Sequence, residues 1–279
     1  MPKDPGDNLT TSAGREAWAH LAAHPTDGLV ALDYDGTLAP IVPRPEDATA
    51  QPGIVDALAA VAGRGVQVAV ITGRPVAAAI SLGGLDRVPG IVILGHYGLQ
   101  RWEDGTLSSP EPGPGVATAR SRLQAYVEAG DPGMTVEDKH QSVALHTRNA
   151  ADPIGEFEAA RPMTQSLADE CGLELVPGRF VLELRPSGID KGGALRAVVA
   201  ERDVRALLFA GDDLGDLPAV TAIADLRGAG VHGMVVCSDS AETPAALRDA
   251  ADLVVPGPPG VLDVVRALDV AIGEAASAG

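Results

Sequence analysis

Residues 29–37 read LVALDYDGT: four apolar residues run straight into an aspartate, and a second aspartate follows two positions later. A short apolar run of this kind is typical of a strand that is buried on both faces of a parallel sheet. Five similar runs follow, at residues 66–71, 91–94, 206–210, 234–237 and 253–255. The six runs together predict the strands of one sheet.

Helical segments are expected around these runs, at residues 12–23, 54–62 and 240–250, and from Lys191 onward. Strands that alternate with helices predict an α/β fold with a doubly wound parallel sheet. Polar residues follow several of the strands, and ligands of such sheets bind beyond the carboxyl ends of the strands. The sequence therefore predicts one site at that edge.

The stretch from about residue 101 to residue 186 has a different pattern. Segments 142–146 and 181–185 alternate apolar and polar residues, which favours an antiparallel sheet with one covered face. Helices are expected around them at 116–129 and 154–171, and the Pro/Gly-rich residues 109–115 predict a linker. We interpret this stretch as an inserted α+β cap domain, with these limits: core 1–105, cap 106–186, core 187–279.

Composition limits the partners of the chain. Its 21 Lys and Arg residues against 38 Asp and Glu residues give a net charge of −17, which repels nucleic acid and anionic membranes. A phosphate ligand would also be repelled, so a phosphate site needs a metal or fixed cations. We find no apolar stretch of membrane-spanning length, and we read Cys171 and Cys237 as ordinary thiols, so a cytoplasmic location is expected.

The motif after the first strand can carry covalent chemistry. The carboxylate of Asp33 can attack phosphorus, and that of Asp35 can protonate the leaving oxygen and then deprotonate water. Gly36 allows a sharp turn, and Thr37 offers a hydroxyl to a phosphate oxygen. The alternative is an acidic turn without a function, because Asp and Gly favour turns.

Three further elements complete the pattern. Asp212 and Asp213 follow another apolar strand and offer the hard oxygen ligands that Mg²⁺ prefers, although an exposed acidic turn would read similarly. Residues 72–74 (Thr-Gly-Arg) supply a hydroxyl and backbone amides that can hold a phosphate. Lys191 can neutralise both the nucleophile and the phosphate.

These four elements, in their order along the chain, resemble the haloacid-dehalogenase superfamily of phosphotransferases. The resemblance implies that Asp33 is the nucleophile and that Asp35 is the general acid/base. It also implies that Thr72 and Lys191 hold the phosphate. The magnesium ligands would be Asp33, Asp35, Asp212 and Asp213.

A narrower resemblance is to the trehalose-6-phosphate phosphatases. It rests on residues 33–41, 137–139, 145–148, 182–186, 190–192 and 211–213. By analogy, Glu137, Lys139 and Glu183 of the cap bind sugar hydroxyls, as carboxylates and amines are suited to do. The other substrate contacts that the resemblance implies are Asp33, Tyr34, Asp35, Gly73, Arg74 and Arg148. A solvated sheet face is the alternative explanation for the cap charges.

One turn departs from that family. Residues 95–100 read GHYGLQ where family members typically carry a Gly-Asn-His-Gly-like turn. If this turn touches the sugar, Tyr97 and Gln100 would change its contacts. His20, His24, His140 and His232 are expected to be surface or satisfied core residues, because no spacing suggests a metal site.

The resulting expectation is a monomeric, Mg²⁺-dependent phosphatase whose partner is a small-molecule sugar phosphate. It would hydrolyse trehalose 6-phosphate through an aspartyl-phosphate. Two alternatives remain open: a phosphatase for a related sugar phosphate, and an inactive protein that only senses the phosphorylated sugar. Substrate profiling separates the first two, and both Asp33 and Asp35 are present, which disfavours the third.

Overall fold

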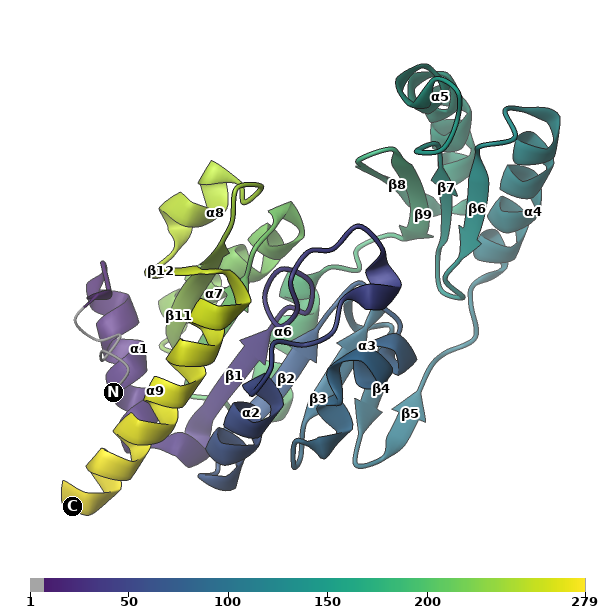
Figure 1. The fold of residues 1–279 in the computed structure, drawn as a ribbon. Helices are drawn as coiled ribbons and strands as arrows, with labels where there is room; N and C mark the ends of the chain where they lie inside the picture. Colours follow the sequence, from purple (N-terminus) through teal and green to yellow (C-terminus); the bar gives the residue numbers. More distant parts are fainter. Residues whose placement is uncertain (1–7, 279) are drawn as a thin grey trace. The chain divides into compact units, whose positions relative to one another are not determined.

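The computed structural model describes residues 8–278, and the chain divides into two compact units (Figure 1). The first unit contains residues up to Ser108 and from Asp190 onward, and the second is Ser109–Ile189. The first unit extends past residue 105 because strand β5 (Thr106–Ser108) pairs with β4 (Gln100–Glu103). The structure therefore groups residues 106–108, which we assigned to the cap, with the first unit, and residues 187–189, which we assigned to the core, with the second.

The first unit is built on an eight-stranded sheet with the order β12-β11-β10-β1-β2-β3-β4-β5. All the neighbouring pairs from β12 to β3 are parallel, and β4 and β5 add an antiparallel edge. The parallel strands are β1 (Gly28–Leu32), β2 (Gln67–Ile71), β3 (Val92–Gly95), β10 (Ala206–Gly211), β11 (His232–Asp239) and β12 (Leu253–Pro256). Each of the six predicted strands is confirmed, and β1 lies between β10 and β2.

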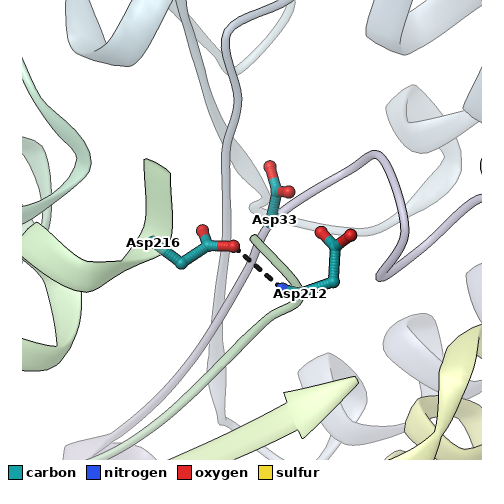
Figure 2. Close-up of side chains that lie close together, drawn as sticks. All are labelled: Asp33, Asp212 and Asp216. Atoms are coloured by element: carbon teal, nitrogen blue, oxygen red, sulfur yellow. Dashed lines mark hydrogen bonds between the residues drawn. The ribbon is translucent and has the colours of Figure 1, made fainter. Parts of the chain in front are cut away.

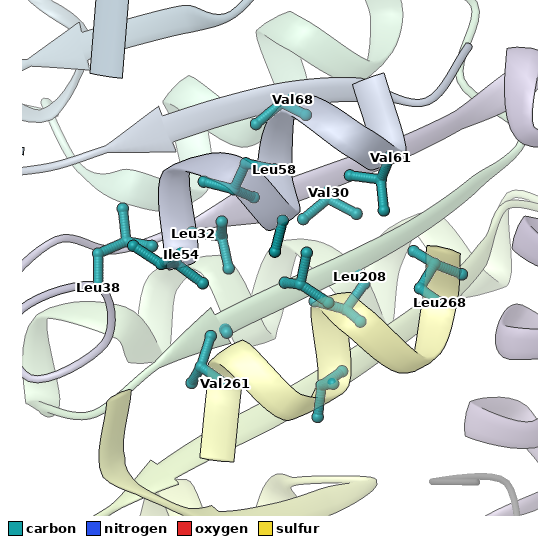
Figure 3. Close-up of a cluster of buried hydrophobic side chains, with 14 of the residues drawn as sticks. Val30, Leu32, Leu38, Ile54, Leu58, Val61, Val68, Leu208, Val261 and Leu268 are labelled. Carbon is teal, nitrogen blue, oxygen red and sulfur yellow. The ribbon is translucent and has the colours of Figure 1, made fainter. Parts of the chain in front are cut away.

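One face of this sheet packs against three long helices. Val30 and Leu32 of β1 point to this side and are fully buried (Figure 3). The helices that share this core are α1 (Ser12–Ala23), α2 (Ile54–Gly63) and α9 (Gly257–Ala278), with the short α3 (Val76–Gly83) beside them. Burying a side chain of this size contributes roughly 1.5–3 kcal/mol, so this layer holds β1 firmly in place.

The opposite face has its own core. Leu29 and Ala31, which alternate with the residues just named, pack there with Leu207 and Phe209 of β10. This face is covered by α6 (Lys191–Glu201), α7 (Leu217–Gly228) and α8 (Ala245–Ala250). Because β1 is buried on both faces, its sequence is continuously apolar rather than alternating.

Helix α8 is shorter than expected. We predicted a helix over residues 240–250, but it begins only at Ala245, after Pro244. Ser240 donates its N–H to the hydroxyl of Thr243 at 2.9 Å and so forms a local turn. Such side-chain bonds to the backbone compete with helix formation.

The second unit is a four-stranded antiparallel sheet with two helices on one face. Val143, Leu145, Leu182 and Leu184 are buried in the core between the sheet and helices. The strand order is β6-β7-β9-β8, with β6 (Thr135–Asp138), β7 (Val143–His146), β8 (Leu173–Gly178) and β9 (Val181–Pro186); the helices are α4 (Pro114–Ala129) and α5 (Pro153–Cys171). The predicted alternation is confirmed, and it leaves the residues in between on the other face.

Two general features complete the description. Among the helices of residues 8–278, none is both long and apolar enough to cross a membrane. Cys171 and Cys237 are free thiols, and burial raises the pKa of Cys237 to about 11.

Candidate active site

Two neighbouring strands bring the first pair of carboxylates together. Asp33 follows β1, and its N–H still donates to the carbonyl of Ala210 on β10 at 2.9 Å. Asp212 follows the end of β10. Because the strands are parallel and adjacent, both side chains emerge at the same edge of the sheet, where the sequence predicts the site.

Lys191 joins this pair from the first residue of α6. Its Nζ lies 2.7 Å from Oδ1 of Asp33 and 2.6 Å from Oδ1 of Asp216. The preceding residue, Asp190, caps the helix by accepting the N–H of Gly193 at 2.7 Å. The cap fixes where α6 starts, and therefore where the buried ammonium lies.

Asp216 is the residue that the sequence analysis missed. It is fully buried, and its Oδ2 accepts the N–H of Asp212 at 2.9 Å and that of Asp213 at 3.1 Å (Figure 2). Asp213 in turn accepts the N–H of Gly215, which completes a reciprocal capping box. An acidic residue three positions after Asp213 is the sequence signal for such a box, so Asp216 could have been found.

Gly36 makes room for this cluster. Its φ is +72°, and a Cβ there would lie only 2.0 Å from Oδ2 of Asp212. No other residue type fits that space, so the glycine is required by close approach as well as by the turn. The hydroxyl of Thr37 is buried without a partner among the described residues, and it remains able to bond an anion.

The cluster contains more negative than positive charge. Burial raises the pKa of Asp33 well above its usual value, although Lys191 acts in the opposite direction. Burial, together with repulsion from Asp213 and Asp216, raises the pKa of Asp212 to about 8. Burial alone would lower the pKa of Lys191, but Asp216 and Asp33 outweigh it and raise it. The site holds four carboxylates, those of Asp33, Asp212, Asp213 and Asp216, and one ammonium, that of Lys191. A further positive charge would therefore be stabilised there.

The donor set suits a hard divalent cation. Asp33, Asp212 and Asp216 each offer an oxygen within 4.8 Å of the others, and no other such group occurs in the described part of the chain. Asp216 already uses its two oxygens for Lys191 and for backbone amides, so Asp33 and Asp212 are best placed as ligands. Of the other two expected ligands, Asp35 bonds Arg74 and Asp213 caps its own turn, so neither carboxylate joins this group.

The loop after β2 lies beside the motif of β1. Thr72 is buried, and its Oγ1 accepts the N–H of Arg74 at 3.1 Å. The guanidinium of Arg74 binds the carboxylate of Asp35 through two bonds of 2.7 and 2.6 Å. The structure thus brings residues 72–74 next to Asp35, and the side chain of Arg74 is bound to that carboxylate.

Tyr34 does not occupy the position that we expected. It is fully buried, and its hydroxyl donates to the carbonyl of Ala48 at 2.9 Å. Burial raises the pKa of Tyr34 to about 12. Its ring belongs to the core under α2 and α3 rather than to a ligand surface, because it follows β1 on the same side as Leu32.

The atypical turn after β3 locks the loop of residues 72–76. Tyr97 donates its N–H to the carbonyl of Thr72, and a Cβ on Gly73 would lie 2.6 Å from the hydroxyl of Tyr97. Gln100 is buried and accepts the N–H of Val76 at 3.0 Å. These contacts give Tyr97 and Gln100 a role in supporting the loop.

The open face of the second unit collects the expected cap residues. Glu137, Ala144 and Glu183 lie side by side across β6, β7 and β9. Lys139 bonds Glu183 at 3.1 Å, and His146 contacts Glu137 at 2.8 Å. Arg148 is exposed in the segment after β7. Three of the four predicted sugar contacts therefore share one charged face.

Comparison with known proteins agrees with this geometry. The family model described as trehalose-phosphatase matches residues 31–252, well over half of the chain. A trehalose-phosphate phosphatase of Mycobacterium marinum is 36% identical over 205 residues, which cover 70% of this chain and 51% of that protein. The chain thus spans about half the length of this relative.

Solved structures agree on the fold. The C-terminal domain of a trehalose-6-phosphate phosphatase from C. albicans superposes with a TM-score of 0.70 at 22% identity, covering 94% of this chain and 99% of that one. A haloacid dehalogenase-like hydrolase from Bacteroides thetaiotaomicron gives 0.62 at 15% identity, covering 85% and 98%. The chain belongs to the trehalose-phosphatase family, and its fold is that of the haloacid dehalogenase-like hydrolases.

Proposed function

We propose that this chain is a Mg²⁺-dependent phosphatase that converts trehalose 6-phosphate and water into trehalose and phosphate through a phosphoryl group on Asp33. The observation that carries the proposal is the buried bridge of Lys191 between Asp33 and Asp216 at the carboxyl edge of the sheet. A monomer in the cytoplasm remains part of this proposal.

The first half of the reaction transfers the phosphoryl group to the protein. An oxygen of Asp33 attacks phosphorus, and the bond between phosphorus and the sugar oxygen breaks. Asp35 gives a proton to that oxygen, so trehalose leaves as a neutral alcohol. Lys191, 2.7 Å from Asp33, balances the charge on the nucleophile and on the phosphoryl group.

The second half restores the carboxylate. Asp35, now ionised, takes a proton from water, and the water oxygen attacks phosphorus. The bond between phosphorus and Asp33 breaks, and phosphate is released. The hydroxyls of Thr72 and Thr37 and the N–H of Gly73 are suited to hold the phosphoryl oxygens during both steps.

Asp33 and Asp212 are the residues that would hold Mg²⁺. Bound there, the ion supplies positive charge to the phosphoryl oxygens and to the nucleophile. The excess of carboxylates over ammonium groups in this cluster supports the assignment. Cation binding also favours the ionised forms of Asp33 and Asp212, whose pKa values burial raises.

The cap face supports a sugar as the leaving group. Glu137 and Glu183 lie on one row across the strands and offer acceptors, and Lys139, which bonds Glu183, offers donors, as polyhydroxylated ligands require. Their mutual bonds hold them in place, and partly solvated ion pairs such as Lys139–Glu137 are weak enough to exchange for ligand contacts. Arg148 is proposed as a fourth contact on the same unit.

The test is phosphate release from trehalose 6-phosphate, sucrose 6-phosphate, mannose 6-phosphate and glucose 6-phosphate, before and after exhaustive chelation. We expect trehalose 6-phosphate to be the best substrate, no turnover after chelation, and recovery with Mg²⁺. Ca²⁺ should fail to restore activity because its larger, looser coordination shell misplaces the reacting groups.

Two variants anchor this experiment. Asp33→Asn should lose at least roughly a thousandfold in turnover of every ester, whereas Asp47→Asn, an exposed aspartate paired with Arg44, should not change it. Better turnover of another sugar phosphate would change the proposed substrate but not the proposed mechanism. Full turnover after chelation, or in Asp33→Asn, would reject the mechanism, and binding without turnover would favour a sensor.

A further inference from the structure

We propose that the side chain of Arg74 is a positioning residue for Asp35 and not the substrate contact that the resemblance implied. The inference rests on the proposed function, because Asp35 acts there as the acid and base. It deepens that function by assigning a separate task to each cation of the site: Lys191 serves the nucleophile, and Arg74 serves the proton carrier.

The contact between Arg74 and Asp35 fixes the orientation of the carboxylate. Nε of Arg74 donates to Oδ2 at 2.7 Å, and Nη2 donates to Oδ1 at 2.6 Å. Two parallel bonds between a planar guanidinium and a carboxylate define both the position and the plane of the acid. A lysine could fix neither in the same way.

Arg74 is itself held from several sides. Its guanidinium carbon lies 5.3 Å from the centre of the Tyr34 ring, a distance that suits a cation–π contact. Its N–H donates to Oγ1 of Thr72, and its carbonyl accepts the N–H of His96 at 3.1 Å. The side chain is 13% exposed, so the arginine forms part of a built loop and not of a free surface.

The Tyr34 ring that packs against Arg74 is also held in place. The Tyr34 ring is fully buried and anchored through its hydroxyl to Ala48. Tyr34 and Asp35 are consecutive residues, so the ring and the carboxylate that flank the guanidinium come from the same short segment. The buried Tyr34 therefore supports Arg74, which in turn orients Asp35.

The two cations of the site are clearly different in what they contact. Nζ of Lys191 lies 2.7 Å from Oδ1 of Asp33, the residue whose carboxylate would accept the phosphoryl group. No contact of Arg74 with Asp33 is seen among the hydrogen bonds and ion pairs of the described residues. The bonds to Asp35 also raise the pKa of Arg74, so it is a permanent cation.

A positioning role predicts a dependence on the leaving group. A good leaving group departs without a proton, whereas a poor one needs the proton that Asp35 delivers. Loss of Arg74 should therefore hurt esters with poor leaving groups and spare esters with good ones. Loss of a phosphate ligand would instead hurt all esters alike, because they present the same phosphoryl group.

The experiment compares kcat/KM for 4-nitrophenyl phosphate, phenyl phosphate and an alkyl phosphate in the full chain with Mg²⁺. This parameter reports formation of the phosphoryl-Asp33 and therefore only the acid role of Asp35. For Arg74→Gln we expect a loss below about threefold on the nitrophenyl ester and about a hundredfold on the alkyl ester, the size of a typical general-acid contribution. Arg44→Gln, which removes an exposed arginine–aspartate pair, should show neither loss.

A double variant gives the second arm. Asp35→Asn should show the same leaving-group pattern, and Arg74→Gln added to it should cost less than about twofold more, because residues that act as a unit are not additive. Uniform losses across the three esters, additive losses in the double variant, or an unchanged Arg74→Gln would each overturn the inference. If the parent chain hydrolyses neither these esters nor trehalose 6-phosphate, the proposed function fails, and the inference fails with it.

Discussion

Two regions of this chain place one lysine between two carboxylates, and they differ in burial. Lys191 in the first unit is 4% exposed, and its partners Asp33 and Asp216 are 6% and 0% exposed. Lys139 in the second unit is 22% exposed, and its partners Glu183 and Glu137 are 14% and 51% exposed. The same residue types therefore form a fully desolvated network in one region and a partly solvated one in the other.

The difference follows from desolvation. Breaking a buried ion pair leaves an unpaired charge and typically costs about 3–5 kcal/mol, whereas exposed pairs contribute about 0–1 kcal/mol. Rearranging the buried network is therefore costly, and such a network suits chemistry that needs fixed charges. The partly solvated pairs around Lys139 cost less to exchange for sugar hydroxyls, and they suit recognition.

The largest effect is expected for Asp216→Ala. This change removes the second partner of Lys191 and the acceptor of two backbone amides, so the ammonium should move away from its position at Asp33. We expect kcat/KM to fall about a hundredfold or more on both trehalose 6-phosphate and 4-nitrophenyl phosphate. Asp225→Ala, which breaks an exposed pair with Arg196, is the matched control; a loss below threefold on both esters would show that Asp216 is dispensable.

An intermediate and selective effect is expected for Glu183→Ala and Glu137→Ala. Each removes one charged partner from the cap face, and a lost bond to a charged group costs about 1.5–3 kcal/mol, or roughly ten- to a hundredfold in kcat/KM. The loss should appear with trehalose 6-phosphate and stay below about threefold with 4-nitrophenyl phosphate, which carries no sugar hydroxyls.

The control for the cap variants is Glu170→Ala on α5, which breaks an exposed pair with Arg122. It should change neither ester. Equal losses on both esters for Glu183→Ala and Glu137→Ala would contradict sugar recognition by this face. The contrast between the two regions would then reduce to a difference in burial without a difference in function.

The smallest effect concerns a third cluster, at the start of β11. The ring of His20 stacks on that of His232 and contacts that of His24, each with centroids 4.8 Å apart. Burial and the two other imidazoles lower the pKa of His20, and Asp27 opposes this. The folded state therefore binds a proton less readily than the unfolded state, and stability is lost as the pH falls through the ordinary value of 6.5.

His20→Gln removes the imidazole whose pKa is lowered and should reduce this acid sensitivity. We expect the Tm difference between pH 7.5 and pH 5.5 to be smaller in the variant by up to about 3 °C, since 1 kcal/mol corresponds to about 2–4 °C in a chain of this size. Thermal unfolding followed by circular dichroism measures it. A larger difference in the variant than in the parent chain would reverse the assigned sign.

Much of the fold could be predicted because the apolar pattern has a simple physical meaning. The continuous run at residues 29–32 indicates burial on both faces, and Leu29 and Val30 do enter opposite cores. The limits of α8 and of the inserted unit were harder to predict. They depend on the local bonds of Ser240 and on the pairing of β5 with β4, which short-range periodicity does not encode.

For the site, the sequence by itself determined which chemical groups are present: the carboxylates at residues 33, 35 and 212, the loop at residues 72–74 and the lysine at 191. They could be recognised because each follows a strand or begins a helix, where parallel topology collects them at one edge. Only the tertiary structure decided their partners. It gave Lys191 a second carboxylate in Asp216, turned Tyr34 into the core and paired Arg74 with Asp35. The reason is that each pairing depends on distances between segments tens of residues apart, and those distances exist only once the strands have packed.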